Sequence, residues 1–209
     1  LEEPLHQTVD AQLPDVKVIE AVETRTTLDE KALAGVAEEI DRAAKILVLA
    51  GQSSANAELD NALTRFVKRT GAMVAAEHLA NLQMPSDCCC TCPELVLGSI
   101  SHGDAAVFQP DLLITFGRHF VSKRIRQFLR DHKPDKHIHV DAGGRHMDTY
   151  QALTRVCAIS PERFFEQMAE MKIQKASGGY TGVWKDREQE VLQIYKHYLD
   201  RAPFSDFTA

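Results

Sequence analysis

Residues 45–51 read KILVLAG, in which residues 46–50 are all apolar and Gly51 follows them. The run is too short for a helix of ordinary length, and it lacks the alternation of a strand with one face in water. A continuous apolar run of this kind is typical of a strand buried on both faces, as in a parallel sheet covered by helices. We therefore predict a buried strand over residues 45–50.

Similar runs and helical patterns continue along the chain. Further runs rich in Val, Ile and Leu predict strands over residues 73–77, 112–116, 138–141 and 156–159. Apolar residues at helical spacing predict helices over residues 28–43, 57–70, 120–132 and 161–171. Thr27 or Asp29 would cap the first helix and Asn56 the second. The alternation predicts an α/β fold: a doubly wound, Rossmann-like parallel sheet with helices on both faces.

This pattern also suggests a domain organisation. We expect a central α/β domain over residues 27–174, preceded by an N-terminal extension or linker over residues 1–26. Residues 175–209 are expected to form a linker and an amphipathic helix that lead toward a further domain. The first residue is Leu1 rather than Met, so we expect the chain to be a piece of a longer gene product.

The C-terminal segment contains a turn signal and a helical pattern. A flexible joint is predicted at Ser177, Gly178 and Gly179. A helix is predicted over residues 183–199, with an apolar stripe formed by Trp184, Val191, Tyr195 and either Tyr198 or Leu199.

Composition excludes several classes of protein. The chain has 209 residues, with 24 Lys and Arg against 30 Asp and Glu, for a formal charge of −6. A general nucleic-acid binder usually has a basic excess, so we expect no nucleic-acid partner. Hydrophobic residues make up 44% and charged residues 26%, which is typical of an ordered domain. No run approaches the roughly 20 apolar residues of a membrane span, and the first residues lack a secretory signal. We expect a cytoplasmic protein.

Four of the five cysteines form a cluster. They are Cys88, Cys89, Cys90 and Cys92, and the fifth is Cys157. An odd number with three adjacent thiols is a poor disulfide framework. Four ligands within five residues can hardly surround a tetrahedral zinc ion, and the redox spacing Cys89-x-x-Cys92 lacks a preceding strand. We expect small reduced thiols in a loop, with zinc binding and redox chemistry as the alternatives.

The loop after the first strand occupies the place of a dinucleotide-binding loop. Residues 51–56 read GQSSAN and contain a single glycine where that motif has G-x-G-x-x-G. Glu77 ends the next strand, where a ribose-binding acid would stand. A capped helix start explains the loop better, and a nucleotide-binding oxidoreductase remains an alternative.

The loop after the third predicted strand is basic. Lys123 and Arg124 fall in the first turn of the next helix, where cations oppose the helix dipole by about 0.3–1 kcal/mol each. A carboxylate or phosphate bound to the free N–H groups and these side chains would remove the conflict. The alternative is a solvated basic helix start, with Arg126 and Arg130 continuing the charge toward water.

His137, His139 and Asp141 alternate along a predicted strand and share one side of it. The pattern could bind a metal, but an exposed edge or hydrogen bonds to a loop explain it more simply. No nucleophile elbow, P-loop or H-E-x-x-H motif occurs. We expect no catalytic residue and no metal ligand in this chain.

Three segments together resemble a known family. Residues 110–117 read PDLLITFG, residues 121–125 read VSKRI and residues 138–141 read IHVD. They resemble the central domain of thiamine-diphosphate enzymes, and most closely that of the 2-succinyl-5-enolpyruvyl-6-hydroxy-3-cyclohexene-1-carboxylate synthases of menaquinone biosynthesis. Residues 45–51, the early Glu3-Pro4-Leu5 and Trp184 are also similar to that family.

The resemblance implies a middle position among three α/β domains. Thiamine diphosphate and Mg²⁺ would lie between the first and third domains of partner subunits, so it implies flanking domains, a homo-oligomer, and no cofactor bound to this part. The family's G-D-G…N metal motif has no counterpart, because the G-D pair at Gly103-Asp104 is followed by Ala105. We expect the chain to be inactive by itself.

The resemblance also implies a reaction and a substrate-binding pair. These transferases decarboxylate 2-oxoglutarate and add the succinyl-semialdehyde unit to isochorismate, and both substrates are anionic. Lys123 and Arg124 match the family's Lys-Arg pair that reaches toward isochorismate, whereas Arg118 matches a variable position and is the weaker candidate. The alternative is a noncatalytic regulatory module that holds an aromatic carboxylate at these three cations.

Overall fold

The computed structural model describes residues 27–101, 103–173 and 179–205, and they contain a six-stranded parallel sheet. The strands are β1 (Ile46–Ala50), β2 (Met73–Ala76), β3 (Cys89–Cys90), β4 (Leu112–Phe116), β5 (Lys136–Val140) and β6 (Arg155–Cys157). Their order is β3-β2-β1-β4-β5-β6, and every neighbouring pair is parallel. This is the order of the doubly wound dinucleotide-binding fold, so the predicted fold class is confirmed.

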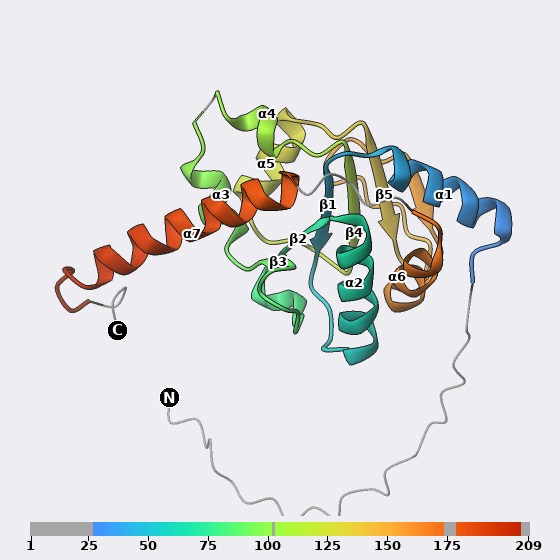
Figure 1. The fold of residues 1–209 in the computed structure, drawn as a ribbon, viewed down its shortest axis with the longest axis horizontal. Coiled ribbons are helices and arrows are strands. Elements are labelled where there is room, and N and C mark those ends of the chain that lie inside the picture. Colours follow the sequence, from blue (N-terminus) through green and yellow to red (C-terminus); the bar gives the residue numbers. More distant parts are fainter. Residues whose placement is uncertain (1–26, 102, 174–178, 206–209) are drawn as a thin grey trace, which may run out of the picture.

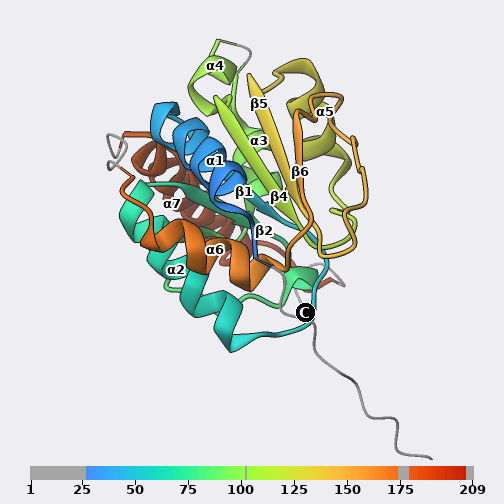
Figure 2. The same ribbon diagram turned by 90° about the vertical axis from the view of Figure 1, so that its right-hand side faces the viewer.

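Helices cover both faces of the sheet (Figures 1 and 2). They are α1 (Glu30–Arg42), α2 (Ala57–Thr70), α3 (Pro93–Ser99), α4 (Ala105–Phe108), α5 (Lys123–Asp131), α6 (Pro161–Glu170) and α7 (Gly179–Leu199), with a short 3₁₀ turn, η1 (His78–Ala80). Asp29 and Asn56 cap α1 and α2 with their side-chain oxygens, as predicted. None of the helices in the described ranges has the length and apolar character needed to cross a membrane.

The central strand β1 shows why both faces need cover. Ile46, Val48 and Ala50 belong to the core that α1, α2 and α6 form on one face. Leu47 and Leu49 belong to the core beneath α3, α4, α5 and α7 on the other face. Because side chains alternate across a strand, a strand buried on both faces must be apolar at every position.

Three elements, β3, α3 and α4, are absent from the sequence prediction, and each is short. They contain two, seven and four residues, respectively, which is too few to show a clear periodicity. In β3, Cys89 and Cys90 pair with Val74 and Ala75 of β2. The predicted location in a loop is therefore wrong for these two cysteines, which form an edge strand, whereas Cys88 lies in the turn before it and Cys92 lies just before α3.

Helix α5 begins at Lys123, three residues later than predicted. Ser122 stands at the N-cap and its Oγ accepts the N–H of Ile125 at 3.3 Å, which sets the first turn. Val121 precedes the helix and is 58% exposed. The apolar pattern over residues 120–132 includes Val121 in the helix, and this is wrong.

Helix α7 begins at Gly179, before the predicted start at residue 183. Trp184 and Val191 are buried as predicted, and Trp184 packs edge-on against Phe108 of α4. Tyr198, by contrast, is 53% exposed. The predicted stripe therefore meets the core over the first half of the helix and leaves it in the second half.

Parts of the predicted organisation lie outside the described residues. These are the extension over residues 1–26 and most of the joint, namely Ser177 and Gly178. The third residue of that joint, Gly179, is the first residue of α7. The domain boundary at residue 174 stays a prediction.

The loops after β1 and β4 join above the carboxyl ends of these strands. Gly51 donates its N–H to the carbonyl of Phe116 at 2.9 Å, and Arg118 donates to the carbonyl of Gln52 at 2.8 Å. A Cβ on Gly51 would overlap the Arg118 carbonyl oxygen, and Gly117 has a φ of 79°. In this fold the nucleotide occupies the crevice at this switch point, and here the two loops fill it.

Because the loops approach closely at Gly51, adding one methyl group at this position should lower the stability of the fold considerably. We expect Gly51→Ala to lower the free energy of unfolding by about 1–3 kcal/mol, because backbone must move to remove the overlap. The control is Gly182→Ala in α7, where no atom lies within 4 Å of an added Cβ. That change should be neutral or stabilise the chain by about 0.5–1 kcal/mol. Urea unfolding measures both free energies. Equal stability of the two variants would contradict the close approach of the two loops at Gly51.

Candidate functional site

The start of α5 is held by a carboxylate from the loop that follows β2. Glu77, just after β2, accepts the backbone N–H groups of Val121 and Ser122 at 2.8 and 2.7 Å. The chain thus supplies its own anion where the sequence suggested that an external carboxylate or phosphate would bind. Glu77 is a cap of the basic loop in this structure, rather than the ribose-binding acid that its position at a strand end suggested.

Lys123 and Arg124 both lie on the surface in the first turn of α5. The Arg124 guanidinium lies against the backbone of Gly98 in α3, where a side chain in place of the glycine would overlap it. It borders a groove of about 540 Å³ between α3 and α7, lined also by Leu95, Val191, Ile194, Tyr195 and Tyr198. Arg124 is therefore placed between the α5 loop and the C-terminal helix.

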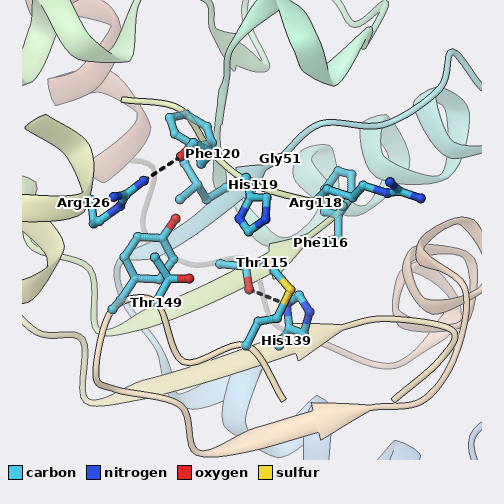
Figure 3. A pocket seen from close by; sticks show the side chains of 13 residues that line it. Gly51, Thr115, Phe116, Arg118, His119, Phe120, Arg126, His139 and Thr149 are labelled. Atoms are coloured by element: carbon cyan, nitrogen blue, oxygen red, sulfur yellow. Dashed lines mark hydrogen bonds between the residues drawn. The ribbon is translucent and has the colours of Figure 1, made fainter. Parts of the chain in front are cut away.

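Arg118 lies in different surroundings from Arg124. It lines a small cavity at the carboxyl ends of β1, β4 and β5, which we call the carboxyl-end pocket. Figure 3 shows that its side chain is directed away from the other lining residues. The predicted gathering of Arg118, Lys123 and Arg124 at one strand end is thus only partly realised, because Arg118 and Arg124 border separate cavities.

The carboxyl-end pocket has a volume of about 30 Å³ and a polar lining that includes Arg126, His119, His139 and Thr149. Arg126 turns toward it and donates to the carbonyl of Phe120 at 3.4 Å (Figure 3). Its Nε is buried without a partner among the described residues.

In the alternative of a solvated basic helix start, Arg126 and Arg130 would extend toward water, and the structure contradicts this for both residues. Arg126 turns inward, and Arg130 donates from Nε to the carbonyl of Thr149 at 2.9 Å. Helical spacing is the signal that could have predicted these positions. Residues 126 and 130 follow the buried Ser122 by four and eight residues, and so lie toward the same side of α5.

His137 and His139 are buried in β5, which lies between β4 and β6. The predicted exposed edge is therefore wrong, although the two rings do share one side. Thr115 Oγ1 lies 2.8 Å from Nε2 of His137 and 2.9 Å from Nδ1 of His139. The hydroxyl has one proton, so it donates to one ring and accepts from the other.

Asp141 does not join the two histidines in a group of possible metal ligands among the described residues. Its carboxylate pairs with Arg145 at 2.6 Å, and that hydrogen bond lowers the pKa of Asp141 to about 2. Within the described ranges, the cluster that can hold a metal is instead Cys90, Cys92 and Glu188. The H-x-H-x-D pattern therefore does not assemble a metal site. Nor does the thiol-rich cluster suit Mg²⁺, which prefers oxygen ligands, so the described residues do not fit a magnesium diphosphate.

Comparison with known proteins places this arrangement in a family. Residues 33–159 match the family model described as "Thiamine pyrophosphate enzyme, central domain". The chain belongs to this family. The matched residues include all six strands of the sheet, from β1 to β6.

Similar proteins are known from several bacteria. The chain is 31% identical to a protein of Flavobacterium johnsoniae over 210 residues, which is 99% of the chain and 37% of the relative. It is 32% identical to a protein of Desulfotalea psychrophila over 163 residues, 75% of the chain and 30% of the relative. Both relatives are named 2-succinyl-5-enolpyruvyl-6-hydroxy-3-cyclohexene-1-carboxylate synthase. The chain spans about a third of the length of each.

The buried histidines predict a loss of stability in mild acid. Burial, and then the charge of His139, lower the pKa of His137 to about 4 from the ordinary 6.5. The unfolded chain therefore takes up the proton first, and stability falls as the pH drops below about 6.5. From about pH 7.5 to about pH 5 we expect His137 to account for a loss of about 2 kcal/mol.

Urea unfolding at a series of pH values measures this loss. His137→Gln, which does not titrate, should show a smaller decrease than the unaltered chain. His197→Gln, at an exposed position in the last turn of α7, is the control and should keep the full decrease. An unchanged pH dependence in His137→Gln would show that His137 is not the group responsible.

Proposed function

We propose that the chain is the central domain of a thiamine-diphosphate-dependent synthase of menaquinone biosynthesis. Together with flanking domains, the enzyme would decarboxylate 2-oxoglutarate and add the succinyl-semialdehyde unit to isochorismate. The observation that carries the proposal is the similarity over nearly the whole chain to proteins named as synthases of this product. The family model and the parallel sheet support the same assignment.

In this proposal Lys123 and Arg124 bind substrate carboxylate. Neither forms an ion pair within the described part of the chain, so both charges face the surface unneutralised. Glu77 contacts backbone N–H groups rather than these side chains, and so it positions the loop without cancelling their charge. The ammonium and the guanidinium of adjacent residues supply two positive charges for a dianionic substrate.

The chemistry itself belongs to other parts of the protein in this proposal. Thiamine diphosphate, when bound, supplies the stabilisation of the carbanion that forms on decarboxylation. The flanking domains would hold it with Mg²⁺. This chain would contribute substrate binding and no catalytic group, and would not turn over alone. The full-length protein is proposed to be a cytoplasmic homo-oligomer.

The C-terminal half of α7 has a surface on which a neighbouring domain could pack. Ile194 is 69% exposed and Tyr198 is 53% exposed, and both line the same groove as Arg124. Large apolar side chains gathered on one surface mark an interaction site more often than they mark a free surface. We propose that the domain after α7 packs here and brings the substrate cleft close to Arg124.

The two alternative functions have less support. A regulatory aromatic acid held jointly by Arg118 and Arg124 does not suit cations that border separate cavities. The carboxyl-end pocket, at about 30 Å³, has room for about one water molecule and none for an aromatic ring. The protein has no open crevice for a dinucleotide, because the loops joined through Gly51 and Arg118 fill that space.

The proposal predicts a selective kinetic effect. In the full-length protein, Lys123→Ala or Arg124→Ala should raise the KM for isochorismate about tenfold or more, because a charged hydrogen bond is lost. The KM for 2-oxoglutarate should change less. Steady-state kinetics with each substrate varied in turn measures both constants.

The matched control is Lys31→Ala, which removes an exposed lysine from the first turn of another helix, α1. It should leave both Michaelis constants unchanged. If Lys123→Ala and Arg124→Ala also leave both unchanged, these residues do not bind substrate. If the full-length protein does not convert the two substrates at all, the proposed reaction is wrong.

A further inference from the structure

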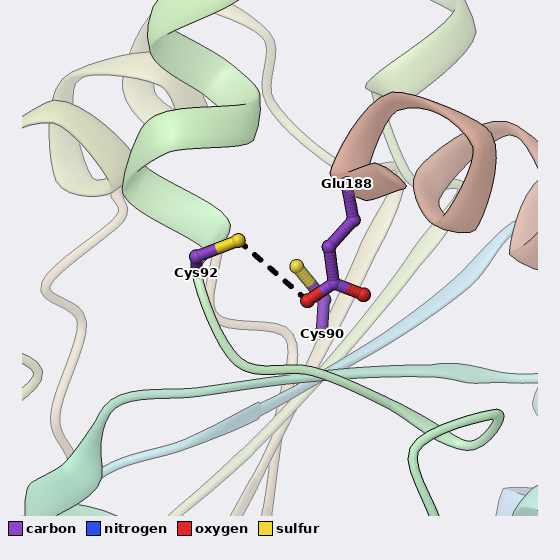
Figure 4. A group of neighbouring side chains, drawn as sticks. All are labelled: Cys90, Cys92 and Glu188. Carbon is purple, nitrogen blue, oxygen red and sulfur yellow. Dashed lines mark hydrogen bonds between the residues drawn. The ribbon is translucent and has the colours of Figure 1, made fainter. Parts of the chain in front are cut away.

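Two thiols and a carboxylate from distant parts of the chain meet at one edge of the sheet. The Sγ atoms of Cys90 and Cys92 and a carboxylate oxygen of Glu188 all lie within 4.8 Å of one another. Figure 4 shows Glu188 reaching down from α7 to the two cysteines. Cys90 is fully buried and Glu188 is 4% exposed, so this is an interior cluster and not a chance surface group.

The strand geometry selects which thiols take part. Successive side chains of β3 point to opposite faces, so Cys89 joins the core beneath α1, α2 and α6. Cys90 joins the core beneath α3 and α7, and Cys92, at the N-cap of α3, packs against that same core. The spacing Cys-x-Cys thus brings two thiols together on the α7 side.

We propose that Cys90, Cys92 and Glu188 bind one thiophilic divalent cation of the zinc class and so attach α7 to the β3–α3 segment. With Zn–S of about 2.3 Å and Zn–O of about 2.1 Å, tetrahedral angles place a sulfur and an oxygen ligand about 3.6 Å apart. Cys92 Sγ lies 3.6 Å from Glu188 Oε1. This pair is thus already spaced as two ligands of one ion, and the Sγ of Cys90 lies within 4.8 Å of both atoms.

The charges around the cluster also suit a divalent cation. Two thiolates and a carboxylate carry three negative charges, so a bound divalent ion leaves the cluster with a net charge of −1. Lys185 neutralises it, because its ammonium pairs with Glu188 and donates to the carbonyl of Cys89 at 3.0 Å. Binding forms two metal–sulfur bonds and one metal–oxygen bond, and the two S–H protons pass to solvent.

The cluster has a route to solvent. Cys92 is half-buried and borders a cavity of about 400 Å³ that is also lined by Thr91, Glu94, His78 and Ser122. An ion can enter through this cavity, and a water molecule from it can complete the tetrahedron as the fourth ligand. Thr91 donates its N–H to Glu188 at 2.8 Å and orients the carboxylate toward the thiols.

Metal titration of the reduced, metal-free chain tests the proposal. Zn²⁺ added in competition with a chromophoric chelator should bind with a stoichiometry of one per chain. Co²⁺ used as a probe should give thiolate-to-metal charge-transfer absorption and the visible bands of a tetrahedral ion. Zn²⁺ should also raise the midpoint of thermal unfolding and slow the proteolysis of α7.

Substitutions identify the ligands. Cys92→Ser and Glu188→Gln should each weaken Zn²⁺ binding about 100-fold or more, which exceeds the usual effect of losing a residue that only orients a ligand. Cys90→Ser should do the same, and Cys92→Ser keeps the test valid if the fully buried Cys90 position does not tolerate a hydroxyl. Cys89→Ser and Cys157→Ser are the controls, since neither thiol faces the cluster, and both should bind as the unaltered chain does.

Two results would overturn the proposal. One is the absence of stoichiometric Zn²⁺ binding by the folded, reduced chain. The other is equal binding by Cys92→Ser and Cys89→Ser, which would show that the ion is held by thiols without regard to their position.

Discussion

Burial of β1 on both faces is the constraint on which the rest of the structure depends. Its five residues leave no polar side chain on either face, so helices must cover the sheet on both sides. Parallel neighbours then require crossover helices, and these bring the carboxyl ends of all strands to one edge. The loops that follow β1, β2, β4 and β5 meet at that edge because β1 lies at its centre.

At that edge the crevice that binds a dinucleotide in other proteins of this fold is closed. Backbone hydrogen bonds between the loops after β1 and β4 fill the switch-point crevice, and the glycines at 51 and 117 allow the close approach. Glu77 then caps the α5 loop from β2. Little space remains for a nucleotide, whereas Lys123 and Arg124 at the start of α5 stay exposed, and these are the charges that we propose to bind substrate.

Helix α7 packs on the same face of the sheet as α3 and α4. Its first half is held by Tyr180, whose hydroxyl donates to the carbonyl of Phe108 at 2.8 Å, and by Trp184. Its buried Glu188 would be costly to hold without compensation, and Lys185 and the N–H of Thr91 offset that cost. The same contacts arrange a carboxylate beside two thiols, so one packing requirement also creates the candidate metal site.

The sequence is enough to predict the fold class, most strands and the long helices, because their apolar patterns report local burial. It also determined the family, through residues 110–117 and 121–125. Tertiary structure alone decided where side chains from separate segments meet: Glu77 at α5, Thr115 between His137 and His139, and Glu188 beside Cys90 and Cys92. Glu188 lies 96 residues from Cys92, and no local pattern records so distant a contact. The short elements β3, α3 and α4 also depend on the sheet, because their own length provides too few contacts to specify them.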